Sequence, residues 1–490
     1  MLTVGDHRGM AEVDIAIIGG GLNGVCIARD AAGRGLRVAL FEQNDLGNGA
    51  ASAAPHLMHG NFIDLERGHA LRVRAALAER DVALRAAPHL VRPARFVLPL
   101  HAKERPPAML RAGLFVYDRL AARSPLPGAE ILDLTVHEAG YPLKRSIGLA
   151  LAWSDCIVDE SRLVILNAVD AAARGAAIRT GARCVWADRS KVWKLTVINR
   201  GRREIVTVRA LVNASGAWTR QVAETVLHLP AVQASFAKVS QIVVRRILDR
   251  DTVYAFQNDD RRMIYAIPLQ RDFTLIGTSE RGFDGDPAMV SAGADDLAYL
   301  CAAASRYVRE RVEPADAVHA MAGCIALGRG DGFAKLNRKH GEAPLLTVGG
   351  GATTSARLRA ERALGQFASL FAASRPWTAA EPLPGGDFPH DSFDDQVDDA
   401  RQRWPFLGER HAERLVAAYG TRIGRFLGAA KSMDDLGPVF GDDLTGAEVR
   451  YLMREEFARF ADDILWRRSK LGLTMSRQDR AALATFMAAA

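Results

Sequence analysis

The hydrophobic positions near the N-terminal end of the chain predict a strand, a tight turn, a helix and a second strand in succession. Ile15, Ile17 and Ile18 form a short β-branched run, which suits a strand buried in a parallel sheet. Glycines and small residues follow, and residues 38–42 form a second apolar run. This succession is a βαβ unit, so the pattern predicts an α/β fold.

Longer helices are predicted where apolar residues recur every three or four positions. Val73, Leu77 and Leu84 follow this spacing and predict a helix over 69–87. A second long helix is predicted over 155–175. Both segments lie between stretches that read as strands, as expected for layers of helix packed on sheet.

Apolar and polar residues alternate through much of the middle of the chain. The alternation over 230–280 predicts a run of antiparallel strands, which suits a domain that forms a substrate site. Residues 343–351 are a strand that enters a glycine turn, and the helix after it is expected to begin at Thr353 or Thr354. Shorter strands are predicted at 176–193 and 205–212.

The last quarter of the chain has a different pattern. Residues 377–390 are rich in proline and glycine and predict a linker. Residues 391–490 carry helical periodicity, and Thr445 and Glu448 have the spacing of a capping box. We therefore expect a separate helical domain after the linker.

Composition and charge narrow the class of protein. The chain has 490 residues, of which 49% are hydrophobic and 25% charged, as in an ordinary globular protein of two or three domains. Its net charge of +7 is scattered, and no nucleic-acid motif occurs, so we expect no nucleic-acid partner. The five cysteines are widely spaced, which predicts buried thiols and no metal site. With no signal-peptide pattern and no long apolar run, we expect a cytoplasmic protein.

One segment raises the question of a membrane surface. Residues 103–128 mix arginines such as Arg111 and Arg119 with apolar residues such as Leu114, Phe115 and Tyr117. A basic amphipathic stretch of this kind fits peripheral contact with the inner face of the cytoplasmic membrane. The alternative, which we favour slightly, is a surface helix that covers a core.

The first glycine turn carries the most specific chemistry in the sequence. Gly19 permits the tight turn, Gly21 lets the backbone approach a pyrophosphate, and Gly24 lets helix and strand pack closely. The helix N-terminus supplies free N–H groups and the positive end of the helix dipole. Glu42, at the end of the second strand, is placed to accept hydrogen bonds from ribose hydroxyls. The unit therefore predicts dinucleotide binding.

Two later glycine turns indicate which dinucleotide binds. Residues 213–216 and 349–351 each follow a strand and precede a helix. Three separated segments that converge on one cofactor are typical of flavoproteins that bind FAD, whereas NAD needs only the first. The helix after the third turn is expected to face the flavin pyrimidine and to stabilise charge on the reduced ring.

With these segments in view, the chain resembles the FAD-dependent (aerobic, respiratory) glycerol-3-phosphate dehydrogenases over nearly its full length. The resemblance rests on Ile17-Ile-Gly-Gly-Gly-Leu-Asn-Gly24, Leu57-Met-His-Gly60, Arg111-Ala-Gly-Leu-Phe-Val-Tyr-Asp118, Ser154-Asp-Cys-Ile-Val-Asp159, Val212-Asn-Ala-Ser-Gly-Ala-Trp218, Leu383-Pro-Gly-Gly386 and Ala461-Asp-Asp-Ile-Leu-Trp-Arg-Arg468. It implies hydride transfer from a secondary alcohol carbon to flavin N5, with quinone or oxygen as electron acceptor.

The resemblance also implies a domain organisation. A Rossmann-like FAD-binding domain is expected at 1–228 and 320–376, with parts of the substrate domain inserted in 75–150. The antiparallel β-rich substrate domain takes 229–319, followed by the linker and the all-α domain. A homodimer is a further hypothesis.

The site residues expected from motif and resemblance form two sets. The catalytic candidates are His59, Arg329 and Thr353. The cofactor-binding candidates are Gly19, Gly21, Leu22, Asn23, Gly24, Glu42, Gln43, Ser52, Leu57, Val185, Ala214, Gly216, Gly350, Gly351, Thr353 and Thr354. His59 is the preferred acid/base group, since a neutral imidazole near the flavin can take a hydroxyl proton; a purely structural hydrogen bond is the alternative.

The substrate positions depart from the family pattern. The loop that reads Ser-Lys-Leu-Ile-His-Gly-Gly-Leu-Arg-Tyr in the family has His56 for lysine, Ile63 for arginine and Asp64 for tyrosine. Ile325 stands where the family has another arginine, and the lysine of the third glycine turn is missing. A phosphate dianion needs two or three fixed cations, each worth about 1.5–3 kcal/mol, so these losses weaken its binding.

Three hypotheses follow for the function. The first is a glycerol-3-phosphate dehydrogenase with a rearranged clamp, in which Arg329 or another cation of that loop (Lys335, Arg338 or Lys339) replaces a family arginine. The second, which we favour, is an oxidoreductase of the same fold with a less anionic small-molecule substrate. The third is a flavin-binding protein without redox turnover.

Overall fold

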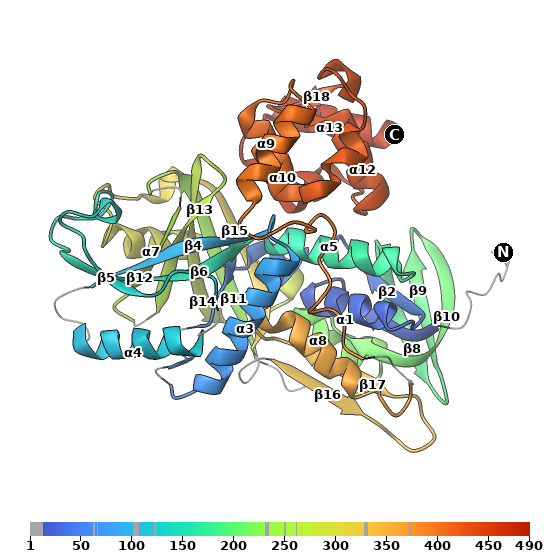
Figure 1. The fold of residues 1–490 in the computed structure, drawn as a ribbon. Coiled ribbons are helices and arrows are strands. Elements are labelled where there is room, and N and C mark those ends of the chain that lie inside the picture. Colours follow the sequence, from blue (N-terminus) through green and yellow to red (C-terminus); the bar gives the residue numbers. More distant parts are fainter. Residues whose placement is uncertain are drawn as a thin grey trace.

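The computed structural model describes residues 13–61, 64–65, 67–100, 107–121, 124–230, 235–248, 251–260, 262–327, 332–371 and 375–490. Two sheets lie side by side, and the C-terminal helices lie above both of them (Figure 1). The α/β class and the helical C-terminal domain agree with the sequence-based prediction.

The first sheet is built around the predicted βαβ unit. Its strands are β1 (Val13–Ile18), β2 (Val38–Glu42), β7 (Ala177–Thr180), β8 (Ala182–Arg189), β9 (Trp193–Asn199), β10 (Arg202–Asn213), β16 (Phe333–Asn337) and β17 (Leu345–Gly349). They lie in the order β16-β17-β10-β1-β2-β7, with β9 paired to β10 and β8 to β9. β1 pairs in parallel with β10 on one side and with β2 on the other. Because parallel strands lie on both sides of β1, a crevice opens at its carboxyl end.

Helices cover one face of this sheet. They are α1 (Leu22–Gly33), α5 (Glu160–Ala173) and α8 (Ala356–Gly365). Ile15 and Ile17 of β1 point into a fully buried cluster with Val25 and Ile27 of α1 and Ile165 of α5. The β-branched run that predicted a buried strand is therefore packed on its helix side by the small-residue helix that follows it.

The second sheet is assembled from both halves of the chain. Its strands are β3 (Leu57–Met58), β4 (Val91–Leu100), β5 (Glu130–Asp133), β6 (Leu149–Val158), β11 (Ser235–Arg245), β12 (Thr252–Gln257), β13 (Met263–Leu269), β14 (Phe273–Gly282) and β15 (Ala317–Leu327). The order is β15-β11-β14-β13-β12-β4-β6-β3, with β5 on β6. The pairings are antiparallel except that of β12 with β4.

The predicted domain boundary at 320 needs a correction. β15 pairs with β11 from Ala317 to Leu327, so residues 320–327 belong to the second sheet and not to the first. Similarly, β3 adds Leu57 and Met58 to the second sheet, and β6 extends it to Val158. The chain therefore crosses between the sheets next to the predicted cofactor loops.

Helices pack on both sides of the second sheet. α7 (Ala294–Ser305) covers one face, where Leu300 and Cys301 contact Ile264 and Ile276. α3 (Ala70–Ala86) and α4 (Pro107–Leu120) pack on the other, where Leu77 joins a buried cluster with Phe96. The helix predicted over 69–87 is thus confirmed.

The helix predicted over 155–175 begins later than expected. Cys156 is still in the ladder of β6, where it lies opposite Pro93 of β4. The helix α5 starts at Glu160, and the Asp159 side chain caps it by accepting the N–H of Arg162. The apolar residues before Asp159 fit a buried strand as well as a helix, and cross-strand pairing decided between them.

The α4 segment is a surface helix over a core. Leu114 and Tyr117 are buried against the second sheet, whereas Phe115 is 60% exposed. This arrangement agrees with the covering-helix interpretation of 103–128; residues 103–106 and 122–123 lie outside the described part of the chain. No helix among the described residues has the length and hydropathy to cross a membrane.

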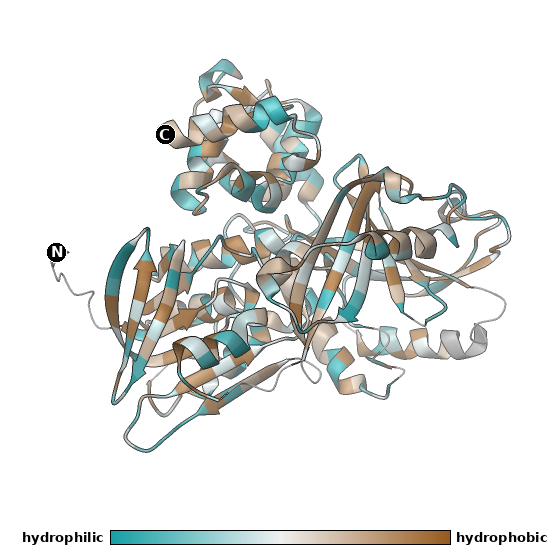
Figure 2. Cartoon of the chain, turned by 180° about the vertical axis from the view of Figure 1, so that it is seen from behind, coloured by the Kyte–Doolittle hydropathy of each residue, from teal (hydrophilic) through white to brown (hydrophobic). Residues whose placement is uncertain are grey.

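The C-terminal domain is helical with one short strand pair. Its elements are α9 (Phe393–Arg403), α10 (Glu409–Tyr419), α11 (Gly424–Leu427), β18 (Val439–Phe440), β19 (Leu444–Thr445), α12 (Gly446–Glu455) and α13 (Arg477–Ala489). Thr445 caps α12 by accepting the N–H of Glu448, while the Glu448 carboxylate accepts from Arg414 and Tyr419. Figure 2 shows hydrophobic residues along the strands of both sheets and polar residues on the outside of the C-terminal helices.

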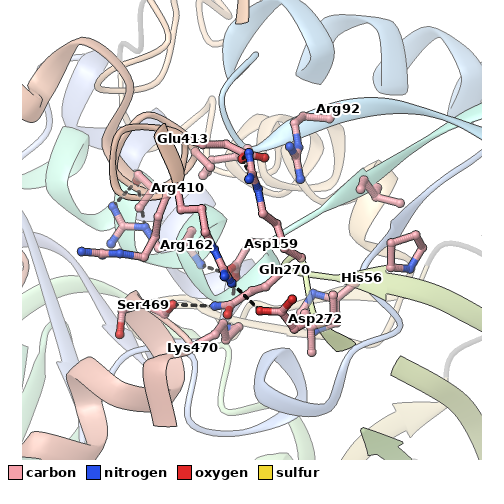
Figure 3. A pocket seen from close by; sticks show the side chains of 18 of the residues that line it. His56, Arg92, Asp159, Arg162, Gln270, Asp272, Arg410, Glu413, Ser469 and Lys470 are labelled. Atoms are coloured by element: carbon pink, nitrogen blue, oxygen red, sulfur yellow. Dashed lines mark hydrogen bonds and ion pairs between the residues drawn. The ribbon is translucent and has the colours of Figure 1, made fainter. Parts of the chain in front are cut away.

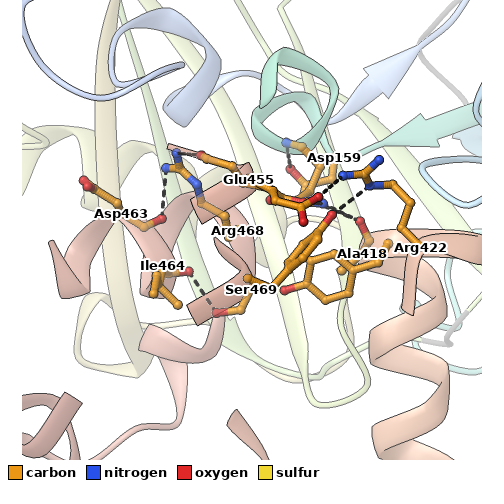
Figure 4. Close-up of polar contacts among 12 residues, drawn as sticks. Asp159, Ala418, Arg422, Glu455, Asp463, Ile464, Arg468 and Ser469 are labelled. Atoms are coloured by element: carbon orange, nitrogen blue, oxygen red, sulfur yellow. Dashed lines mark hydrogen bonds and ion pairs between the residues drawn. The ribbon is translucent and has the colours of Figure 1, made fainter. Parts of the chain in front are cut away.

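Buried charges fasten this domain to the rest of the molecule. Arg468 donates to the Asp45 carboxylate at 2.8 Å, and Arg467 also pairs with Asp45. Arg162 of α5 pairs with Glu456 at 3.0 Å (Nη2–Oε1). Figure 4 shows the turn around Arg468, which also donates to the Asp463 carbonyl. The Asp45 loop follows β2, so the C-terminal domain contacts the same segment that carries Glu42.

Candidate active site

A cavity of about 520 Å³ lies at the carboxyl ends of β1, β2, β10 and β17, on the side facing the second sheet. Its walls come from both sheets, because Cys324 and Ile325 of β15 face the glycine turns of the first sheet. Most of the predicted site residues line it: Gly19, Gly21, Leu22, Asn23, Glu42, Gln43, Leu57, His59, Ala214, Gly216, Gly350, Gly351, Thr353 and Thr354.

The first glycine turn has the geometry that close backbone approach requires. Gly19 has φ +111°, and a Cβ there would overlap the Ala214 carbonyl. A Cβ on Gly24 would overlap the Gly19 carbonyl oxygen, so this glycine serves the packing of α1 on β1 and does not line the cavity. A Cβ added to Gly21 would have no atom within 4 Å of it. The turn therefore leaves open space in front of the N-terminus of α1.

Glu42 holds the same turn from the second strand. Its Oε2 accepts the N–H of Gly20 at 2.7 Å and its Oε1 accepts the N–H of Asn44 at 2.8 Å. Burial raises the pKa of this carboxyl. Across the cavity, Asn23 donates to the Gly350 carbonyl at 3.3 Å and accepts from Arg359 at 2.8 Å. These bonds connect the first and third glycine turns directly.

Besides Gly24, two predicted residues do not line the cavity, and the structure does not describe a third. The Ser52 hydroxyl donates to the Gly49 carbonyl at 2.7 Å and is not among the lining residues. Val185 does not line the cavity either, although its neighbours Arg183 and Cys184 do. Arg329 lies outside the described residues.

His59 is held firmly beside the third glycine turn. Its backbone N–H donates to Thr354 Oγ1 at 3.2 Å, and its Nδ1 accepts the N–H of Asn61 at 3.1 Å. Burial lowers the pKa of the imidazole, so the ring is neutral. A neutral ring whose Nδ1 accepts a hydrogen bond carries its proton on Nε2. In this arrangement His59 offers a donor to a bound molecule.

A buried network that the sequence did not indicate supports the His59 loop. The Tyr117 hydroxyl donates to Asp155 at 2.8 Å and accepts the N–H of Gly60 at 3.0 Å. Arg80 and Trp153 donate to the same carboxylate at 2.7 and 2.8 Å. Tyr117 and Asp155 both occur in the family motifs quoted above, which was the only signal available in the sequence.

Glu160 is a second residue that sequence analysis missed. Its Oε1 accepts the Thr353 hydroxyl at 2.7 Å, and its Oε2 accepts the N–H of His56 at 3.1 Å. Burial raises the pKa of Glu160 to about 8. The carboxyl lines the cavity beside the third glycine turn. It is therefore a protonated acid near neutral pH, in contact with a predicted cofactor residue.

Cations are scarce in this cavity. Among the described lining residues, arginines occur at positions 183 and 359, and lysines at none. Arg359 is bonded to Asn23, to Ser355 and to the Ala352 carbonyl. Ile325 lines the wall where the family pattern has an arginine.

The other candidate cations do not reach the site. Arg338 donates to Gln366 and Ser369, and Lys339 pairs with Glu342. Lys335 is exposed on β16. Asp64, which replaces the family tyrosine, accepts from Asn61 at 3.0 Å. Ile63 lies outside the described residues.

Among the described residues, no group of three His, Cys, Asp or Glu side chains is arranged to hold a metal ion. The parallel strands β17, β10, β1 and β2, a glycine turn before α1, an acid ending β2 and a second sheet closing the same cavity together define a dinucleotide-binding protein. The open space at Gly21 and the bonded turn at Gly350 fit a long cofactor that spans from adenine to flavin.

The chain belongs to the FAD dependent oxidoreductase family, whose model matches residues 14–356. Residues 376–490 match the C-terminal domain of alpha-glycerophosphate oxidase. The protein is therefore an FAD-dependent oxidoreductase of the glycerol-3-phosphate dehydrogenase type, and the predicted cofactor and family are confirmed.

Relatives with known names cover nearly the whole chain. A glycerol-3-phosphate dehydrogenase of Pseudomonas aeruginosa is 41% identical over 98% of this chain and 96% of its own length. A D-erythritol 1-phosphate dehydrogenase of Brucella abortus is 38% identical, with 96% of each chain covered. The glycerol-3-phosphate dehydrogenase of Bacillus halodurans, solved in complex with FAD, has the same fold, with a TM-score of 0.79 at 22% identity over 98% of this chain and 91% of that one.

Proposed function

We propose that the protein oxidises a secondary alcohol carbon of a small polyol-type substrate that is less anionic than glycerol 3-phosphate. Bound FAD supplies the two-electron acceptor, which takes a hydride at N5. Gly19, Gly21 and the N-terminus of α1 would hold the pyrophosphate, and Glu42 the adenosine ribose. The turn from Gly350 to Thr354 would hold the pyrimidine end of the flavin.

In this proposal His59 orients the substrate. Its Nε2–H would donate to the hydroxyl oxygen of the substrate and orient the carbon whose hydride goes to the flavin, while the hydroxyl proton is released to solvent; Asn61 keeps the ring proton off Nδ1. The network beneath, from Tyr117 to Asp155, keeps the loop in place. A donor held in place in this way lowers the barrier because the reacting carbon is already positioned when the hydride leaves.

The observation that supports the altered substrate is the charge of the cavity wall. Arg359 is committed to its own hydrogen bonds, and Ile325 replaces a family arginine. Glu280 adds an exposed carboxylate to the wall. Arg183, the other arginine of the described wall, stands on β8 beside the residues that follow β2, away from the third glycine turn. A phosphate dianion next to the third glycine turn would therefore meet the Glu280 carboxylate and an arginine already committed to other bonds, which disfavours its binding.

The second candidate is glycerol-3-phosphate dehydrogenase itself. Relatives of that name at 41% and 36% identity support it, and Arg329, two residues beyond β15 in the sequence and outside the described residues, is its candidate replacement cation. The D-erythritol 1-phosphate dehydrogenase is 38% identical to this chain and is named for a different substrate.

An anaerobic titration separates these candidates. The yellow holoenzyme is mixed with glycerol 3-phosphate, with glycerol and with a panel of hydroxy acids, amines and other polyols, and the oxidised flavin band is followed. Bleaching by an uncharged or singly charged substrate, with none by glycerol 3-phosphate, is the expected result. Bleaching by micromolar to millimolar glycerol 3-phosphate that Arg329→Gln abolishes would overturn the proposal in favour of the second candidate. Flavin that only dithionite reduces would indicate binding without turnover.

Membrane contact, electron acceptor and oligomeric state stay predictions. Phe115 and Val116 face outward on α4, with Arg119 over the Phe115 ring at 4.7 Å. If this face binds lipid, anionic liposomes should sediment the protein at low salt and release it at high salt. Turnover assays with oxygen or with a soluble quinone test the electron acceptor. Light scattering tests the oligomeric state.

A further inference from the structure

One short segment of the C-terminal domain, residues 467–470, contacts two parts of the chain that wall the 520 Å³ FAD cavity. These parts are the loop after β2 and the first turn of α5. Among the described residues of the C-terminal domain, none lines the FAD cavity itself. Any effect of residues 467–470, the docking segment, on a molecule in that cavity therefore passes through the side chains that they contact.

The first contact of the docking segment is with the loop that follows β2. Arg467 and Arg468 both pair with the Asp45 carboxylate, Arg468 at 2.8 Å (Nη2–Oδ1). Arg467 also donates to the side-chain oxygen of Asn48 at 3.3 Å. Asp45 and Arg468 are buried, so salt screens their attraction little. Residues 43, 44 and 47–51 of this loop line the FAD cavity, so the two arginines hold one of its walls.

The second contact is with the first turn of α5 (Figure 3). Lys470 Nζ lies 3.4 Å from the Asp159 carboxylate, which caps the helix by accepting the N–H of Arg162. Arg162 in turn donates to the Ala418 carbonyl at 2.6 Å and pairs with Glu456 at 3.0 Å. The C-terminal domain thus holds the start of this helix by both of its charged side chains.

The same helical turn reaches the FAD cavity. Glu160 accepts the hydroxyl of Thr353 at 2.7 Å and the N–H of His56 at 3.1 Å. Thr353 belongs to the third glycine turn and lines the cavity, as does Leu57, which follows His56. The bonds that fix the first turn of α5 therefore bear on the third glycine turn and on the loop that leads to His59.

The C-terminal domain has other charged contacts that do not reach the FAD cavity. Arg271, in the turn between β13 and β14, pairs with Glu409 at 2.9 Å and with Glu413 of α10. Arg410 pairs with Asp272 in the same turn. None of these residues lines the FAD cavity. If the domain served stability alone, these pairs and those of the docking segment would have interchangeable effects.

We propose that the docking segment positions the FAD site, so that docking of the C-terminal domain and FAD binding strengthen each other. Arg467, Arg468 and Lys470 are positioning residues, which act on the cofactor through Asp45, Asn48 and Asp159. The proposal rests on the placement of FAD in the 520 Å³ cavity made above. By thermodynamic linkage, the factor by which docking raises FAD affinity equals the factor by which FAD favours docking.

Fluorescence titration of the intact chain with FAD tests the effect of docking on the cofactor. Arg467→Gln should raise the FAD dissociation constant about tenfold or more, since a charge-assisted contact with the loop after β2 is lost. Lys470→Gln removes a weaker pair and should raise it about threefold. Lys470→Arg keeps the charge and should bind FAD more nearly as the unaltered protein does. Arg271→Gln, the matched control, removes interdomain pairs on the second sheet and should leave FAD affinity unchanged.

Limited proteolysis of the linker at 377–390 tests the effect of the cofactor on docking. FAD should slow cleavage of the unaltered protein, because cleavage follows the population in which the domains are apart when opening is fast. Arg467→Gln should lose protection by FAD by the same factor by which it loses FAD affinity. Arg271→Gln should be cleaved faster with and without FAD and should keep the full protection.

Two results would overturn the proposal. Unchanged FAD affinity in both Arg467→Gln and Lys470→Gln would mean that the docking segment serves stability alone. An equal loss of FAD affinity in Arg467→Gln and Arg271→Gln would mean that any loosening of the domain has the same effect. The melting temperature of each apoprotein confirms that it is folded.

A separate variant tests the placement of FAD on which the proposal rests. Gly21→Ala alters the turn in front of α1 without touching the C-terminal domain. Unchanged FAD affinity in Gly21→Ala would refute the placement of the cofactor, and the proposal with it, whatever the docking variants show. Weakened binding by Gly21→Ala and by Arg467→Gln, with none by Arg271→Gln, is the result we expect.

Discussion

The hydroxyl of Tyr117 lies 2.8 Å from Oδ2 of Asp155 and donates its proton to that buried carboxylate. The same oxygen accepts the N–H of Gly60, next to His59. A helix on the outside of the second sheet thereby fixes the loop that carries His59 at the cavity wall. The segment that suggested a membrane surface in the sequence contributes its buried side to the active site.

Tyr117→Phe should lower the free energy of unfolding by about 1–3 kcal/mol, because it leaves a buried carboxylate and a backbone N–H each short of one partner. Chemical denaturation measures the change. Tyr141→Phe is the control, since Tyr141 is 66% exposed. Equal stability of the two variants would contradict the structural role of this network.

Alanine substitutions at two glycines of the first turn should distinguish an effect on FAD affinity from an effect on the stability of the apoprotein. Gly21→Ala adds a methyl group where nothing lies within 4 Å and φ is −79°, so the apoprotein should keep its stability. The same methyl intrudes on the space for the pyrophosphate, and the FAD dissociation constant should rise about tenfold or more, a loss of roughly 1.4 kcal/mol.

Gly24→Ala should behave in the opposite way. Its methyl group overlaps the Gly19 carbonyl, so the apoprotein itself should be destabilised by about 1–3 kcal/mol. Fluorescence titration with FAD and thermal melts of the apoproteins give both quantities. A destabilised Gly21→Ala apoprotein with unchanged FAD affinity would refute this division of roles.

Glu160 should make stability depend on pH. Burial raises its pKa from 4.5 to about 8, so the folded chain stays protonated while the unfolded chain ionises. The stabilisation is fully present below about pH 4.5 and is lost as pH rises towards 8, with a slope of at most about 1.4 kcal/mol per pH unit.

Glu160→Gln removes this dependence. A glutamine can accept from the His56 N–H and donate to Thr353, so the variant should fold and should gain stability over the unaltered protein as pH rises from 5 to 8. Denaturation at several pH values measures the difference, with the exposed Glu310→Gln as control. Parallel pH profiles for Glu160→Gln and the unaltered protein would exclude a raised pKa.

Asp45 should govern the docking of the C-terminal domain. Asp45→Ala leaves Arg467 and Arg468 buried without their carboxylate and should cost about 3–5 kcal/mol. We expect a lower melting temperature and faster proteolysis in the linker at 377–390. Asp398→Ala removes only a surface pair at 4.0 Å and is the comparison. Unchanged proteolysis would mean that other contacts hold the domain.

Local patterns were sufficient for the parts of the fold that depend on local chemistry. The turn from Gly19 to Gly24 needs residues without side chains, and this requirement is visible in any sequence. The start of α5 was misjudged because the apolar residues before Asp159 suit either element until β4 pairs with them. Glu160 and Tyr117 were missed because their partners, Thr353 and Asp155, are 193 and 38 residues away.

The two residues at the start of α5 face different cavities. Asp159 lines a cavity of about 800 Å³ between the second sheet and the C-terminal domain, and Glu160 lines the 520 Å³ cavity of the candidate active site. A peptide unit joins them, so neither can shift without moving the other. A substitution that moves the Asp159 backbone is therefore expected to shift the Glu160 carboxyl and its bond to Thr353.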